Sequence, residues 1–303
     1  MKNKLYKQKE PQERYTTLEW LGGSCGSMNL GISLVRDTHT GERLICKEIN
    51  ANAADYEHEV AELLSQFPNI VRVQDYIPAS QAQDSGSGSK LYMQYCDSGD
   101  LGDLINNHSD AGKKIPESFI WHVFYSIAKA LEACHTGLGA ENWVPYWHHD
   151  LHKKNVFLDS SKNGDEHPKV LLADFGLTDT SQSPDVLELM AQGTDCYNLV
   201  EIILQLCLPE EADEVHEDWA ERLKELDGRQ DGMYSRELKQ ILYTCDHAWF
   251  RDQNDDKKVV CKMVRMIEEL RPQNRLHEHE GKVLSGSAQS SRSRVPSLSR
   301  RAA

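Results

Sequence analysis

Two stretches of the chain carry residues whose types and spacing suit chemistry on phosphate groups. In the first, from Trp147 to Leu158, the carboxylate of Asp150 is followed by the amide of Asn155. In the second, Asp174 supplies another carboxylate directly after an apolar run. Phosphoryl transfer needs such a set, because one carboxylate orients the attacking hydroxyl while an Asn and a second Asp hold the magnesium ions that bridge the nucleotide phosphates. These residues indicate a phosphotransferase.

Apolar runs beside these residues position them. The strand-like run 156–158 follows Asn155 and the run 170–173 precedes Asp174, so a hairpin would bring the two side chains together. The loop His148–Asn155 and the turn Asp174-Phe175-Gly176 resemble the catalytic loop and the metal-binding turn of the eukaryotic protein kinases. The resemblance implies that Asp150 is catalytic, that Asn155 and Asp174 are metal ligands, and that the cofactors are ATP and Mg²⁺.

The resemblance covers roughly residues 15–270 and implies an α+β fold with two lobes. The smaller N-terminal lobe would hold an antiparallel sheet and one helix, and the larger C-terminal lobe would be mainly helical. We expect the N-lobe over residues 15–96, the C-lobe over 97–281, and a disordered Ser/Arg-rich tail over 282–303. Apolar residues at helical spacing predict a core helix over 118–134.

Lys47 is the candidate phosphate-binding cation of the N-lobe. It lies in the apolar run 43–49, and a buried ammonium group is costly unless it meets an anion. The run resembles the kinase strand that ends in Ala-x-Lys, and the resemblance implies a glutamate partner on the helix over 55–67. We expect this partner to be Glu59, with Glu57 and Glu62 as alternatives. The alternative, in which Lys47 has no role in phosphate binding, is an edge-strand lysine whose charged end reaches water.

A glycine-containing loop follows the first predicted strand, which covers residues 15–20. Leu21, Gly22, Gly23 and Gly26 are candidate nucleotide contacts, because glycine lets backbone N–H groups approach a triphosphate closely. The GxGxxG spacing of the kinases is not met, and two adjacent glycines also occur in ordinary hairpin turns.

The run 90–96 resembles the segment that joins the two kinase lobes. On that resemblance Met93 guards the back of the adenine pocket, and the backbones of Gln94 and Cys96 pair with the edge of the adenine. A domain boundary is therefore expected directly after Cys96.

Asp195 is expected to support the catalytic loop. The run 195–206 resembles the buried kinase helix whose aspartate hydrogen-bonds the backbone of that loop. An alternative alignment assigns Gly193 to Glu201 to the Gly-Thr…Pro-Glu run of the family. It would require the acidic stretch 209–227 to be the buried helix, which disfavours it. On the favoured alignment the activation segment is severely shortened.

Composition limits the remaining possibilities. The 303 residues carry a net charge of −14, which argues against nonspecific nucleic-acid binding. The N-terminal residues do not read as a signal peptide, and no stretch approaches the roughly 20 apolar residues that span a bilayer. We therefore expect an intracellular, cytoplasmic protein without a membrane partner, with the nucleus as an alternative. The eight cysteines show no CxxC pair, so neither a zinc ribbon nor a disulfide framework is indicated.

Two departures from the kinase pattern bear on the substrate. His149 stands where the family usually carries Arg, and His152 where Ser/Thr kinases carry Lys. We expect an ATP- and Mg-dependent Ser/Thr protein kinase acting on a protein hydroxyl. A small-molecule kinase of the aminoglycoside or choline type and a non-catalytic kinase-like binding module are the alternatives. In the tail, Ser297 lies in a pattern that basophilic kinases accept, so such a kinase is a candidate partner.

Overall fold

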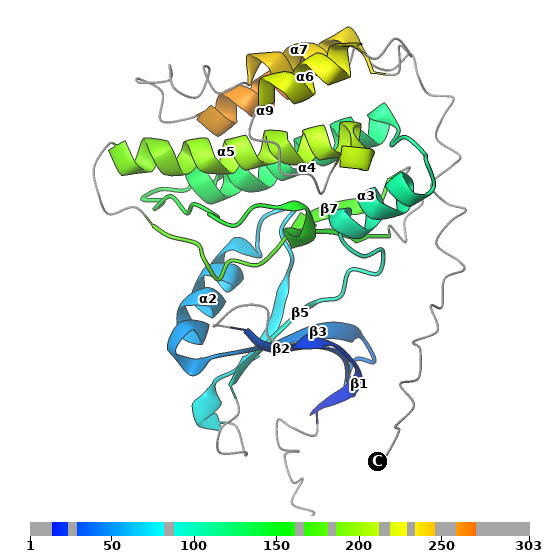
Figure 1. The fold of residues 1–303 in the computed structure, drawn as a ribbon. Coiled ribbons are helices and arrows are strands. Elements are labelled where there is room, and N and C mark those ends of the chain that lie inside the picture. Colours follow the sequence, from blue (N-terminus) through cyan, green and yellow to red (C-terminus); the bar gives the residue numbers. More distant parts are fainter. Residues whose placement is uncertain are drawn as a thin grey trace, which may run out of the picture.

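The computed structural model describes residues 14–23, 29–81, 88–160, 167–180, 186–211, 219–228, 234–245 and 259–270. The first lobe is a five-stranded antiparallel sheet with strand order β1-β2-β3-β5-β4 and one helix, α2 (Figure 1). Its elements are β1 (Tyr15–Gly23), β2 (Asn29–Asp37), β3 (Arg43–Ile49), α2 (Ala51–Leu64), β4 (Val73–Ile77), the 3₁₀ turn η1 (Ala79–Gln81) and β5 (Ser89–Gln94).

The second lobe is mainly helical, with one short hairpin facing the first lobe (Figure 1). Its helices are α3 (Leu101–Asp110), α4 (Glu117–Thr136), α5 (Val186–Cys207), α6 (Trp219–Gly228), α7 (Arg236–Thr244) and α9 (Val259–Leu270). The hairpin is formed by β6 (Val156–Asp159) and β7 (Lys169–Leu172), and the 3₁₀ turns are η2 (Gly137–Gly139), η3 (Lys153–Asn155) and η4 (Pro209–Glu211).

Helices α4 and α5 form the centre of the second lobe. They pack against each other and against α9, and α6 and α7 lie farther from the first lobe (Figure 1). Helix α4 is buried on most sides, with fully enclosed Phe119, Trp121 and Phe124, and it ends at Gly137 in the left-handed conformation (φ 58°). A helix that is apolar around most of its circumference needs neighbours on several sides, which accounts for its central place.

Helix α2 begins at Asn50, whose side chain accepts a hydrogen bond from Asn52 N at 3.3 Å. Its buried residues are Ala54, Glu57, Val60, Ala61 and Leu64. This spacing of three or four residues defines a single face, and that face carries one carboxylate. The sequence of α2 therefore places Glu57, and no other glutamate of the helix, against the lobe.

The predicted α+β fold with two lobes is confirmed, and the predicted helix over 118–134 lies within α4. The predicted boundaries at residues 96 and 281 stay predictions, and the tail 282–303 lies outside the described residues. In the part of the chain that the structure describes, no helix is long and apolar enough to cross a membrane.

Candidate active site

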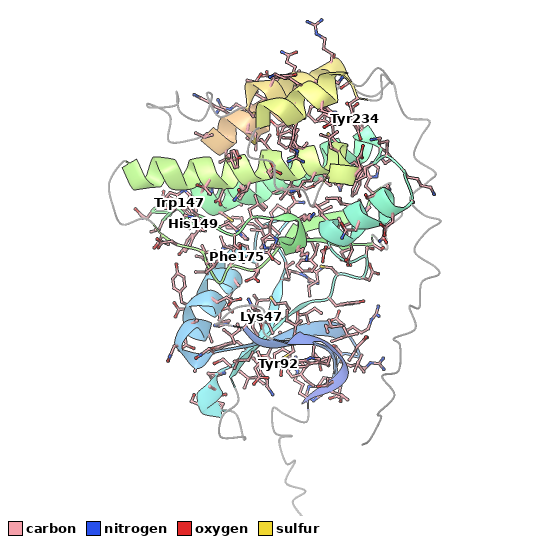
Figure 2. The ribbon with its side chains drawn as sticks, in the orientation of Figure 1. Lys47, Tyr92, Trp147, His149, Phe175 and Tyr234 are labelled. Carbon is pink, nitrogen blue, oxygen red and sulfur yellow. The ribbon has the colours of Figure 1, made fainter. Side chains whose placement is uncertain are left out.

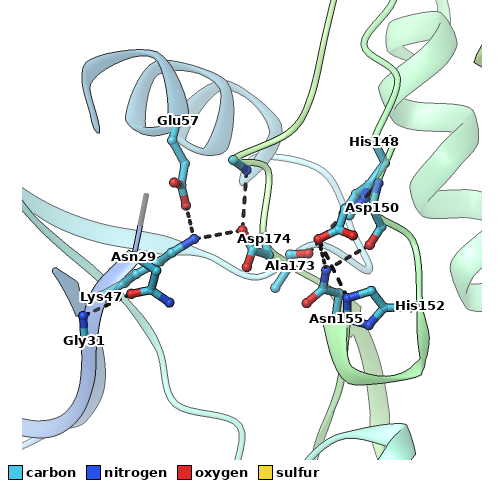
Figure 3. Close-up of polar contacts among 11 residues, drawn as sticks. Asn29, Gly31, Lys47, Glu57, His148, Asp150, His152, Asn155, Ala173 and Asp174 are labelled. Atoms are coloured by element: carbon cyan, nitrogen blue, oxygen red, sulfur yellow. Dashed lines mark hydrogen bonds and ion pairs between the residues drawn. The ribbon is translucent and has the colours of Figure 1, made fainter. Parts of the chain in front are cut away.

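Lys47 lies at the centre of an ion-pair network between the lobes (Figure 3). Its Nζ is 2.7 Å from Glu57 Oε1 and 2.8 Å from Asp174 Oδ1, and the residue is 7% exposed. Burial lowers the pKa of Lys47, but Asp174 and Glu57 more than offset this and raise it above its usual value. The lysine is therefore a permanent cation between strand, helix and the 174–176 turn.

Glu57, and not Glu59, is the partner of Lys47, so the prediction of Glu59 is wrong. Glu59 is exposed, because it lies two residues from Glu57 and therefore points away from the buried face of α2. The signal that identifies Glu57 was in the sequence: it precedes Val60, Ala61 and Leu64 at helical spacing.

The two carboxylates on Lys47 differ in their surroundings. Burial dominates at Glu57 and raises its pKa despite the lysine. At Asp174 burial also raises the pKa, but Lys47 and the N–H of Gly176 prevail and hold it below its usual value. Asp174 is thus the anionic carboxylate that faces the space between the lobes, with its side chain 39% exposed.

The catalytic loop brings Asp150 and Asn155 into contact. Asn155 Nδ2 donates to Asp150 O at 2.8 Å and to Asp150 Oδ2 at 3.1 Å. Because the amide nitrogen is used this way, the amide oxygen of Asn155 is turned away from Asp150 (Figure 3). Strand pairing of β6 with β7, together with a 3.0 Å bond from Ala173 N to Asn155 O, sets Asn155 beside the strand that leads to Asp174.

These oxygens fit a magnesium ion, which prefers carboxylate and carbonyl oxygen ligands. Lys47 and Gly176 N occupy Oδ1 of Asp174, and among the described residues nothing hydrogen-bonds its Oδ2. That atom and the amide oxygen of Asn155 would hold the ion. A transition-metal site has no such support, since no group of three His, Cys, Asp or Glu side chains in the described ranges could hold one.

His148 connects the catalytic loop to the turn at Asp174. The residue is 1% exposed, its Nδ1 accepts from Asp150 N at 3.2 Å, and its Nε2 donates to Ala173 O at 3.0 Å. Burial lowers the pKa of His148, so the ring is neutral and its proton is on Nε2. This linking role was not predicted from the sequence.

Asp195 on α5 supports the catalytic loop through hydrogen bonds to its backbone, as the favoured alignment predicts. Its carboxylate accepts from His148 N at 2.9 Å, His149 N at 3.0 Å and His135 Nε2 at 2.9 Å. Burial raises the pKa of Asp195, but the His135 contact and the backbone N–H groups prevail and lower it below 3.8. These bonds also hold His149 in the left-handed region (φ 60°), a conformation that costs of order 1–3 kcal/mol for a residue with a side chain.

We expect Asp195→Ala to lower the free energy of unfolding by about 3–5 kcal/mol, because three buried donors lose their anionic acceptor. Urea unfolding measures the loss, and Asp110→Ala, at an exposed site, is the matched control with a change below about 0.5 kcal/mol. The pKa of Asp195 is lowered by folding, so its contribution is present above pH 3.8 and is lost as pH falls through the folded pKa. A wild-type-like midpoint for Asp195→Ala at pH 7 would contradict this account.

The nucleotide-facing residues predicted in the first lobe lie on two strands. Leu21, Gly22 and Gly23 end β1, and Gly26 lies outside the described residues. Met93 on β5 lies on the same sheet face as Lys47, because Lys47 is paired with Leu91 and side chains alternate along a strand. Their contact with nucleotide stays a prediction.

Gln94 and Cys96 connect β5 to the second lobe. Gln94 N donates to Arg72 O at 2.9 Å, and the Gln94 side chain donates to Asp159 Oδ2 of β6 at 2.8 Å, which ties the connection to the second lobe. Burial raises the pKa of the Cys96 thiol to about 12 and that of Cys46 to about 11. Both are therefore inert packing thiols at neutral pH.

The segment after the turn is short. Phe175 is buried against His148, with ring centroids 5.3 Å apart, and Asp179 pairs with Trp147 through two backbone hydrogen bonds of 3.0 and 3.1 Å. Helix α5 begins at Val186, and residues 181–185 lie outside the described part. Figure 2 shows Lys47 in the first lobe, with Phe175, His149 and Trp147 on the facing side of the second.

Comparison with known proteins agrees with this geometry. Residues 15–216 match the protein kinase domain, and the chain belongs to the protein kinase family. Similar proteins are the G2-specific protein kinase nimA of Emericella nidulans, 31% identical over 202 residues (57% of this chain, 27% of the relative), and the serine/threonine-protein kinase Nek2 of Homo sapiens, 29% identical over 198 residues (57% and 42%). The chain therefore spans less than half the length of these relatives.

Proposed function

We propose that this chain is an ATP- and magnesium-dependent serine/threonine protein kinase with a shortened activation segment. The observation that carries the proposal is the assembled network of Lys47, Glu57 and Asp174 opposite the Asp150–Asn155 pair. Kinases need the lysine–glutamate pair and the metal-binding aspartate in place together. The similarity to serine/threonine kinases of the nimA and Nek2 type supports a hydroxyl on a protein as the acceptor.

The roles follow from the contacts. Lys47 would neutralise nucleotide phosphates, Asn155 and Asp174 would hold magnesium, and Asp150 would orient the acceptor hydroxyl and accept its proton. Bound Mg·ATP supplies the transferable phosphoryl group. Leu21, Met93 and the 94–96 connection would enclose the adenine. We also propose an intracellular, cytoplasmic site of action, and phosphorylation of Ser297 by a basophilic kinase, on the sequence grounds given above.

Incubation with [γ-³²P]ATP, MgCl₂ and a degenerate serine/threonine peptide mixture tests the function. Transfer by the wild type and a loss of about 10²–10⁴-fold in Asp150→Asn is the expected result. Hydrolysis or transfer only with aminoglycosides or choline would favour the small-molecule alternative. ATP binding without any transfer would favour a binding module.

Magnesium should be required for nucleotide binding, because Asn155 and Asp174 offer it oxygen ligands, and the carboxylates of Asp150 and Asp174 would otherwise repel the phosphates. At about 100 times its Kd, Mg·ATP should stabilise the wild type by about 2.7 kcal/mol. Asp174→Ala should remove this stabilisation and Asp110→Ala should retain it. Thermal-shift curves that respond equally to ATP with MgCl₂ and with EDTA would contradict the prediction.

A further inference from the structure

We infer that the acceptor segment of the substrate is acidic, carrying Glu, Asp or phosphorylated side chains next to the hydroxyl. This inference rests on the proposed kinase function and names the substrate class of the same site. It is carried by three exposed side chains of the loop that contains Asp150, which we call the basic rim: His149, His152 and Lys154.

The rim residues are exposed, and all three belong to the loop that carries Asp150. His149 has φ 60°, which follows from the anchoring of its N–H on Asp195, and its side chain is exposed. His152 is also exposed, and its Nε2 is 3.7 Å from Asp150 Oδ2. Its Nδ1 accepts from Lys154 N at 3.2 Å, so the proton is on Nε2, which is a donor beside the acceptor position (Figure 3).

Lys154 extends the rim toward α3. A Cβ placed on Gly102 in the first turn of α3 would lie 3.2 Å from Lys154 Cγ, so the stem of the lysine runs along that turn. Among the described residues Lys154 forms no ion pair. The carboxylate of Asp100 caps α3 by accepting from Asp103 N at 2.9 Å and lies near Lys154. Burial raises the pKa of Asp100, and the charge of Lys154 partly offsets this, but the two side chains form no ion pair. Lys154 is exposed, so an anion can approach its ammonium group.

The charge of the rim is opposite to that of the molecule. The chain has 48 acidic and 34 basic residues, yet residues 148–155 contain three His and two Lys with Asp150 as the single acid. With its histidines neutral, this stretch has two Lys against one Asp, a formal charge of +1 in a chain of net charge −14. A locally positive loop in an acidic protein favours anionic over cationic ligands. The acidic residues near the rim are Asp100, beside Lys154, and the exposed Asp179, which forms an isolated β-bridge with Trp147.

The segment after Gly176 is short, so we expect the catalytic loop that carries Asp150 to contribute to substrate selection. Only nine residues separate Gly176 from Val186, the start of α5. Of the first of them, Thr178 is buried, Leu177 and Asp179 are exposed, and Asp179 pairs with Trp147. With so short a segment, the loop that carries Asp150 and the basic rim supplies part of the surface beside an acceptor hydroxyl.

Three peptides of equal length test the inference, each with one central serine flanked by Glu, by Ala or by Arg. At about 50 mM salt, we expect kcat/KM for the Glu peptide to exceed that for the Arg peptide at least tenfold, and the ratio to fall as salt rises. Lys154→Glu should reduce the ratio at least fivefold without changing KM for ATP more than twofold. Lys224→Glu, the same charge change at an exposed site on α6, should leave the ratio unchanged.

The outcomes separate the two proposals. Phosphorylation of the Ala or Arg peptide as fast as the Glu peptide would overturn the acidic-substrate inference while the kinase function stands. If the Glu-to-Arg peptide ratio of kcat/KM is unaltered in a folded Lys154→Glu protein, the role of the basic rim is overturned. No phosphate transfer to any peptide, with wild-type ATP binding, would defeat the kinase proposal itself and this inference with it.

Discussion

Asp150→Asn should reduce phosphoryl transfer by about 10²–10⁴-fold, the usual contribution of a positioned general base. The variant keeps the shape of the side chain and can still contact Asn155, so the loop should keep its conformation. Affinity for Mg·ATP should change less than threefold, because Lys47, Asn155 and Asp174 provide the proposed nucleotide and metal contacts. Single-turnover transfer and nucleotide titration measure the two effects separately.

The control for Asp150→Asn is Asp110→Asn, which makes the same chemical change at the exposed end of α3. It should transfer phosphate at the wild-type rate. Retained turnover in Asp150→Asn would show that another group accepts the proton. An equal loss of Mg·ATP affinity would instead place Asp150 among the nucleotide ligands.

Glu57→Gln should lower kcat/KM about a hundredfold, whereas Glu59→Gln should stay within twofold of the wild type. The amide removes the charge that holds the ammonium of Lys47 at 2.7 Å in a site where both residues are buried. The amide oxygen of the glutamine could still accept a hydrogen bond from Lys47, but the ion pair that links β3 to α2 would be lost. A hundredfold change corresponds to about 2.7 kcal/mol, somewhat less than the about 3–5 kcal/mol for removing one partner of a fully buried ion pair.

Steady-state kinetics on the two glutamine variants shows which glutamate is needed as the partner of Lys47. They differ by two positions in one helix, carry the same chemical change and differ in burial, so a general effect on α2 is controlled for. A large loss of kcat/KM in Glu59→Gln, with little loss in Glu57→Gln, would mean that α2 rotates about its axis in the working enzyme.

Several features of the site could be predicted from the sequence because they are local. Asp150, Asn155 and Asp174 belong to short stretches in which side-chain chemistry and the following β-rich runs already define a phosphate-directed loop and hairpin. The core helix α4 was predictable for the same reason, since apolar residues at helical spacing must face a common interior. The position of Asp195 followed from the resemblance of the helix around it.

Tertiary structure alone decided how these pieces meet. Helical spacing already puts Glu57 on the face of Val60, Ala61 and Leu64, and the tertiary structure turns that face toward β3, so that Glu57 meets Lys47. The contact of His135 with Asp195 and the link from His148 to Ala173 join residues far apart in the chain, and no local spacing encodes them. Such contacts form because a buried polar group must find a partner wherever the packed helices and strands supply one.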